Sequence, residues 1–253
     1  MDIKLDIKQC GKPEELYRTL RDEIDISNID RHLKYFCGYE KLSGEAVSLK
    51  TVRYIERELA VCGIQCRTEE FPAYLSNPVS SRLLVAGEEI PSRPRSFSGS
   101  CGEMEAELVF DPSTADTGIT ETEKARFLQT VRGKLVVGYG FDERYGKTLE
   151  MYGAAGWIQV WRSDEALVHE DTVSPVWGTP DMDSRFLLMK MPVAGITRVN
   201  GEMLIRRIKE QPQGLKASLQ VVMETGVKTV SLPWAEIGGA VEDFVLLSCH
   251  YDT

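Results

Sequence analysis

The feature that most constrains the fold is a short apolar run near the C-terminal end of this 253-residue sequence. The run Phe244–Cys249 carries no charged side chain and is apolar at alternating positions on both faces. A strand of this kind is typical of the centre of a sheet that is covered on both sides. Because helices cover both faces of such a sheet, the sequence favours an α/β fold.

Helical spacing, helix-start residues and alternating apolar residues divide the rest of the chain into short elements. Helices are predicted over Pro13–Ile24, Ser48–Cys62, Lys147–Tyr152 and Val199–Glu210. One more helix is predicted to run toward Phe36, with Ser27 as its N-cap. Strands are predicted over Gln65–Phe71, Arg82–Ala86, Met104–Phe110, Gly133–Tyr139, Trp157–Trp161, Val193–Thr197, Leu215–Glu224 and Lys228–Ile237. Pro233, inside the last of these, indicates an edge position or a bulge.

Frequent proline and glycine after Phe71 indicate an inserted, strand-rich module. We therefore expect three regions: a helical lead-in over residues 1–75, the inserted module over 76–212, and the first strands of a truncated α/β domain over 213–253.

Composition excludes several classes of function. The formal net charge is −9, and nucleic-acid binding needs clustered Lys and Arg instead. No apolar run approaches the roughly 20 residues that span a bilayer. The start, Met1–Asp6, alternates apolar and charged residues, unlike the continuous apolar stretch of a signal peptide. We expect a cytoplasmic protein that binds neither nucleic acid nor membrane.

The six cysteines lack the paired C-x-x-C spacing of a structural zinc site. We expect free thiols, as is usual inside cells. The six are Cys10, Cys37, Cys62, Cys66, Cys101 and Cys249.

The chemistry-bearing residues follow the apolar run directly. His250 and Asp252 are two residues apart, so in extended chain their side chains point the same way, and functional groups gather at the carboxyl ends of strands in open α/β sheets. An imidazole there can bind a metal ion while a nearby carboxylate orients it. A bare His-x-Asp triplet is also common in an ordinary polar loop after a strand, and that alternative stays open on spacing alone.

The wider context resembles the start of the catalytic domain in the zinc aminopeptidase family, which includes bacterial leucyl aminopeptidases, glutamate carboxypeptidase and the transferrin receptor ectodomain. The resemblance lies in Trp234–Gly239 and Glu242–Thr253, although Leu232-Pro233 stands where the family usually has Asn-Val. The middle of the chain resembles the protease-associated domain that some members insert. Its marks are Gly133–Val137, Tyr152–Ile158 and Met191–Ile196.

The resemblance implies a mixed-sheet zinc-exopeptidase domain, here only begun, with an inserted β-rich protease-associated (α+β) domain. It implies that His250 is the first ligand of one zinc ion, and that Asp252 is a catalytic residue that supports the site without binding the metal. The complete family site holds two zinc ions, and its remaining ligands follow the His-x-Asp motif. This sequence therefore supplies at most one partial site.

No other residue is expected to complete the metal site. His32 falls in a predicted surface helix, and His169 in a polar loop of the inserted module. Cys249 faces away from its neighbour His250 on a strand, so we do not expect it to act as a nucleophile.

Two functions fit these observations. In the first, the chain is the N-terminal part of a zinc-dependent exopeptidase, an aminopeptidase that cleaves peptide substrates, and is inactive alone. In the second, it is a non-catalytic protein whose protease-associated domain serves in binding or dimerisation. Substrate preference and homo-oligomerisation stay open.

Overall fold

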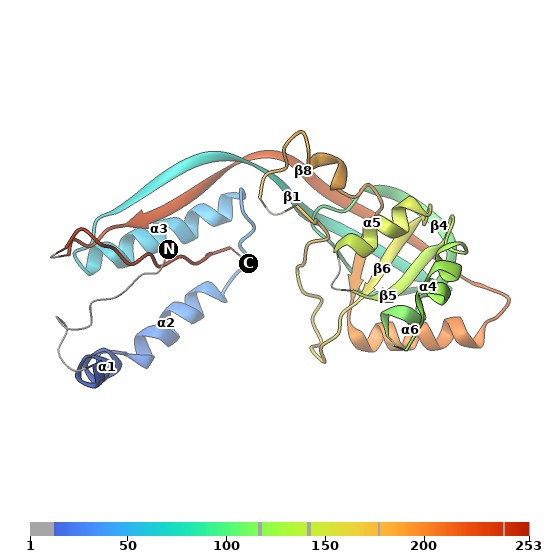
Figure 1. Ribbon diagram of the computed structural model, residues 1–253, viewed down its shortest axis with the longest axis horizontal. Helices are drawn as coiled ribbons and strands as arrows, with labels where there is room; N and C mark the ends of the chain where they lie inside the picture. The colour runs from blue at the N-terminus through green and yellow to red at the C-terminus, as the bar shows by residue number, and fades with distance from the viewer. Residues whose placement is uncertain (1–12, 116–117, 141–142, 177, 240, 253) are drawn as a thin grey trace.

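Two long antiparallel strands, β1 (Cys66–Val85) and β8 (Leu215–Ala235), run through the molecule and connect its two ends (Figure 1). The sequence predicted four shorter strands over these ranges. In the structure they form two continuous strands, because the β1–β8 pairing continues through the segments between them. The register shifts between Pro78 and Ser80, which accommodates Pro78, a residue without a backbone N–H to donate. The predicted boundary after residue 75 thus lies inside β1.

This computed structural model describes residues 13–115, 118–140, 143–176, 178–239 and 241–252. The segment Met1–Asp6, Cys10 and Thr253, which entered the sequence-based expectations, lie outside these ranges. Within the described ranges, none of the helices has the length and apolar character needed to cross a membrane.

The two long strands belong to an eight-stranded mixed sheet with the order β2-β1-β8-β4-β5-β6-β7-β3. The strands β4, β5, β6 and β7 are parallel to one another, whereas β8 is antiparallel to both of its neighbours. The shorter strands are β2 (Glu88–Ile90), β3 (Arg93–Pro94), β4 (Cys101–Phe110), β5 (Leu135–Tyr139), β6 (Gly156–Val160) and β7 (Val193–Ile196).

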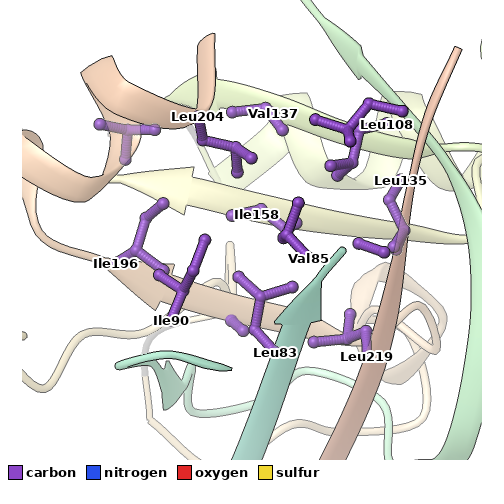
Figure 2. Packing of buried hydrophobic residues seen from close by; sticks show 14 of the residues in the cluster. Leu83, Val85, Ile90, Leu108, Leu135, Val137, Ile158, Ile196, Leu204 and Leu219 are labelled. Atoms are coloured by element: carbon purple, nitrogen blue, oxygen red, sulfur yellow. The ribbon is translucent and has the colours of Figure 1, made fainter. Parts of the chain in front are cut away.

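Helices cover both faces of the parallel part of the sheet, which confirms the predicted α/β class. Leu204 of α6 (Arg198–Glu210) packs with Val137 and Ile158 on one face, as Figure 2 shows. On the other face Leu149 of α5 (Glu143–Met151) packs with Trp157. Of the two predicted alternatives at Pro233, an edge or a bulge, the structure shows the edge: among the described strands β4 pairs with β8 only at residues 215–221, so at Pro233 β8 pairs with β1 alone.

Sequence reasoning missed α4 (Glu121–Leu128), although its capping box was readable. The Thr120 hydroxyl accepts a hydrogen bond from the Glu123 backbone N–H, and the Glu123 carboxylate accepts one from the Thr120 N–H. A Thr followed three residues later by Glu is a helix-start signal.

From residue 13 onward, where the description of the chain begins, three helices precede the sheet: α1 (Pro13–Asp22), α2 (Ile26–Phe36) and α3 (Ala46–Val61). The predicted N-cap of α2 was wrong, because the cap is Asp25, whose carboxylate accepts the Ser27 N–H. Aromatic stacking holds α2 against α3, since the ring of Tyr35 stacks on that of Tyr54 with centroids 3.6 Å apart. In turn, α3 lies against β1 and β8.

The run Phe244–Cys249 does not form the central strand that the sequence predicted. Its residues have no strand assignment, and Phe244 and Leu247 are 82% and 90% exposed. A strand requires a neighbour to pair its backbone groups, and among the described residues no strand pairs with this run. In Figure 1 the chain after β8 instead doubles back toward the loop between α2 and α3.

Candidate functional site

The candidate site is built on the loop that joins α2 to α3, which is fixed to the two long strands. Gly44 in this loop has φ +74, and a Cβ there would lie 2.8 Å from Cδ1 of Leu75. The Glu45 carboxylate accepts hydrogen bonds from Nζ of Lys228 at 2.6 Å and from Nδ2 of Asn77 at 2.7 Å. Asn77 Nδ2 also donates to the Ser43 carbonyl at 3.2 Å. These contacts place Ser43 over the middle of β1 and β8.

The C-terminal segment meets this loop. The Ser43 hydroxyl donates a hydrogen bond to Oδ2 of Asp252. The second oxygen, Oδ1, lies 3.3 Å from Nδ1 of His250. Between them, the Tyr251 hydroxyl donates to the Ser231 carbonyl in β8 at 2.6 Å. The predicted pair of side chains therefore lies together, although no strand positions it.

Burial and charge shift the acidity of the groups around this junction. Burial and the negative charge of Asp252 raise the pKa of Tyr251, so its hydroxyl remains a donor. Hydrogen bonds from Lys228 and Asn77 lower the pKa of Glu45. Burial disfavours the ammonium of Lys228, but its hydrogen bonds to Glu45 and Glu224 outweigh that effect and raise the pKa. The Glu45–Lys228 pair is therefore ionised at neutral pH.

His250 and Asp252 lie at a cavity of about 660 Å³ that is shared with the middle module. The cavity falls within the roughly 300–1,000 Å³ that is usual for ligand sites. The loop before α3, the middle of β1 and the segments 96–97, 170–176 and 178–179 provide its walls. Residues from all of these segments line the cavity, among them Ser43, Tyr74, Ser76, Phe97, Thr179, His250 and Asp252.

A metal ion would find one suitable ligand here. The His250 side chain is 86% exposed, and its Nδ1 lies 3.2 Å from the backbone carbonyl and 3.3 Å from the carboxylate of Asp252, contacts of the kind that commonly orient metal-binding imidazoles. A catalytic zinc site needs about three protein ligands. No group of three His, Cys, Asp or Glu residues in the described ranges could hold a metal ion. His250 fits as one member of a larger ligand set.

The other residues considered from the sequence lie elsewhere. His32 Nδ1 lies 2.8 Å from the Tyr54 hydroxyl. His169 stacks on Trp161, with ring centroids 5.0 Å apart. Cys249 is exposed, and the five described cysteines are free thiols, as predicted.

Sequence reasoning missed the residues that hold or surround the pair. Nothing in the sequence marks Ser43 or Asn77 as a support of the pair, and Phe97 stands in an ordinary Ser-Phe-Ser context. Only Gly44, between two helical patterns, gave a signal that the loop makes a close approach.

Comparison with known proteins places the fold among zinc aminopeptidase-like structures. No protein-family model matches the chain, and no curated protein sequence matches it. An aminopeptidase from Aneurinibacillus sp. strain AM-1 is similar over 86% of this chain and 49% of its own, with a TM-score of 0.54 and 20% identity.

Two further solved structures have the same fold. BSAP, a zinc aminopeptidase from Bacillus subtilis, has a TM-score of 0.56 at 18% identity, over 78% of this chain and 42% of its own. A peptidase M28 precursor from Shewanella amazonensis SB2B has a TM-score of 0.59 at 14% identity, over 79% and 48%. The chain thus spans less than half the length of each of these structures.

Proposed function

We propose that this chain is the N-terminal part of a zinc-dependent exopeptidase, an aminopeptidase that hydrolyses peptide bonds, and that it is inactive without the rest of the site. The observation that carries the proposal is the pairing of His250 with Asp252 at a cavity between the two ends of the molecule. The similarity in fold to solved aminopeptidases supports it.

In this proposal His250 is one zinc ligand, and Asp252 fixes the orientation of its ring. Asp252 is itself fixed by Ser43, so the loop before α3 sets the direction in which the imidazole points. The bound metal would supply an acidified water as the nucleophile. The remaining ligands come from chain outside these residues.

Exposed apolar side chains support a role as one part of a larger domain. Leu246 is exposed in the C-terminal segment, and so are Ile26 and Leu33 on α2. Apolar surface of this kind is usually covered by further structure. We propose that the rest of a peptidase domain covers these residues and pairs with Phe244–Cys249 as a strand.

The proposal is tested by assaying the longest product of the coding sequence on aminoacyl-nitroanilides, with and without a chelator. Chelator-sensitive release of nitroaniline that is restored by zinc is the expected result. The His250→Ala variant should lose that activity, and in the metal-free 253-residue chain it should keep the wild-type unfolding temperature, because the ring is exposed there. Activity that persists in the chelator would exclude the metal mechanism.

The alternative function, binding or dimerisation through the middle module, needs no metal site. It is therefore also compatible with the incomplete set of metal ligands among the described residues. If the coding sequence supplies no further ligands after Thr253, this second function becomes the better proposal.

A further inference from the structure

Two aromatic side chains of the cavity belong to neither hydrophobic core. Phe97 and Tyr74 lie with ring centroids 6.2 Å apart and planes inclined by 36°. Both line the cavity that also holds His250 and Asp252. Neither ring belongs to the two buried clusters that hold the sheet and its helices together. The rings therefore need an explanation other than core packing.

Phe97 has a strained backbone conformation, which indicates a functional role for its side chain. Its φ is +63, in the left-handed region that bulky side chains rarely occupy. It is the third residue of a turn closed by the Ser98 N–H, which donates to the Arg95 carbonyl at 3.0 Å. Glycine is the favoured residue at a turn position with positive φ. A strained residue beside a cavity is a recognised sign of a functional role.

The surrounding chain fixes this turn firmly. The Ser96 N–H donates to the Asp171 carbonyl at 2.9 Å, and the Val173 N–H donates to the Ser96 carbonyl at 3.0 Å. After the turn, the Gly99 N–H donates to the Met191 carbonyl at 2.9 Å, and a Cβ on Gly99 would lie 1.8 Å from the Lys190 carbonyl oxygen. The ring of Phe97 is consequently presented from a rigid support.

The cavity also offers an open strand edge. Outside its pairing with β8, β1 pairs with a described strand only at residues 83–85, through β2. The Tyr74 N–H points to the open side, where it donates to Oγ1 of Thr179 at 3.3 Å. A peptide on this side would replace Thr179 as the acceptor of the Tyr74 N–H, whereas Ser76, two residues further along the strand, is only 4% exposed and stays covered. An extended peptide can bind such an edge through its own backbone groups.

We propose that Phe97 and Tyr74 form a subsite for an aromatic side chain of a peptide that lies along the open edge of β1. Alternate side chains of an extended peptide point the same way, so one of them can reach the two rings. Offset or inclined ring pairs bind better than contact area alone accounts for, which favours an aromatic over an aliphatic side chain. The inference rests on the proposed peptidase function for its biological role, whereas the binding itself needs no metal.

The test is a titration of the metal-free 253-residue chain with the tripeptides Ala-Phe-Ala, Ala-Leu-Ala and Ala-Ala-Ala, followed by backbone NMR. Affinity should fall in that order, and the shifted amides should include those of Tyr74, Phe97 and Thr179. The Phe97→Gly variant should bind Ala-Phe-Ala about tenfold more weakly and Ala-Ala-Ala as before. Its unfolding temperature should equal or exceed that of the wild type, because glycine accepts the backbone conformation.

The matched control is Ala86→Gly, since Ala86 is the other described non-glycine residue with positive φ (+51) and is not in the cavity lining. It should gain stability without any change in peptide affinity. A Phe97→Asn variant, which also tolerates this conformation, repeats the test with a second side chain.

Three outcomes would overturn the subsite: equal affinity for the three peptides, absence of shifts with all of them, or wild-type binding by Phe97→Gly. A lower unfolding temperature for Phe97→Gly would assign the ring to folding instead. These results are independent of chelator-sensitive hydrolysis, so a failed subsite and a failed peptidase assignment are distinguishable.

Discussion

The Ser43 hydroxyl donates a hydrogen bond to the Asp252 carboxylate, and so joins residues that are 209 positions apart in the sequence. One partner belongs to the loop before α3 and the other to the C-terminal segment. This bond, with that of the Tyr251 hydroxyl to the Ser231 carbonyl, holds the end of the segment in place. The orientation of His250 thus depends on residues of the N-terminal third of the chain.

Replacing Ser43 with alanine should release the C-terminal segment without unfolding the protein. A hydrogen bond to a charged group contributes about 1.5–3 kcal/mol, so without it the Tyr251 and Asp252 backbone should become mobile on the ps–ns timescale. A fall in the NMR order parameters of these two residues measures this. The Ser43→Thr variant keeps the hydroxyl and should remain close to the wild type. Unchanged order parameters in Ser43→Ala would show that this bond does not hold the segment.

Replacing Gly44 with alanine should destabilise the contact between the loop and the long strands. The added Cβ would lie 2.8 Å from Leu75 Cδ1 and 2.9 Å from Lys228 Cβ, in a residue whose φ is +74. Backbone strain and overpacking together should lower the free energy of unfolding by about 2–4 kcal/mol in a urea titration.

Gly63 provides the matched control for that experiment. It has the same φ of +74, but a Cβ there would meet no atom within 4 Å. Gly63→Ala should therefore cost only the backbone strain of about 1–2 kcal/mol. Equal losses in the two variants would mean that the loop does not pack as tightly as the structure shows.

The Glu45–Lys228 pair should make stability depend on pH in the acidic range. Hydrogen bonds from Lys228 and Asn77 lower the folded-state pKa of Glu45 below its ordinary value of 4.5. A lowered pKa means that the stabilisation is complete above pH 4.5 and is lost as the pH falls through the folded-state value. Glu45→Gln should lower the free energy of unfolding by about 1 kcal/mol at pH 7, because Lys228 is largely buried.

Measurement of unfolding by denaturant between pH 7 and pH 3 tests this expectation. The difference between the wild type and Glu45→Gln should shrink toward zero at the acidic end. As a control, Glu121→Gln removes a fully hydrated partner of Lys124 and should have no measurable effect at any pH. A difference that stays constant with pH would contradict the assigned ion pair.

Much of the fold was readable from local patterns. The helix Ser48–Cys62 was predicted within two residues of α3 at its start, because Val52 and its apolar neighbours recur at helical spacing. The strand predicted at Trp157–Trp161 matches β6 equally closely, since Trp157, Ile158 and Val160 give it the largely apolar character of a buried parallel strand. The joining of the short strands into β1 and β8 was not readable, because pairing between segments about 150 residues apart leaves no local signal.

The candidate site was readable only in part. His250 and Asp252 were identified from their position after an apolar run, and the structure brings them together. Their supports, Ser43 and Asn77, were missed because polar residues in loops and strands gain a role only from the tertiary contacts they make. The strand prediction for Phe244–Cys249 failed for the same reason, since a sequence with strand character still needs a partner strand.

The exposed side chains of the C-terminal segment should cause self-association of this chain. Phe244 and Leu246 are 82% and 76% exposed in a segment without strand partners, and apolar side chains next to unpaired backbone favour association. The double variant Phe244→Ser and Leu246→Ser should shift sedimentation velocity profiles toward the monomer at every concentration, with an unchanged unfolding temperature. Met151 on α5 is 77% exposed, so Met151→Ser is the matched control and should associate like the wild type. If the double variant and this control associate equally, the contact lies elsewhere on the surface, and the segment does not act as an unpaired strand.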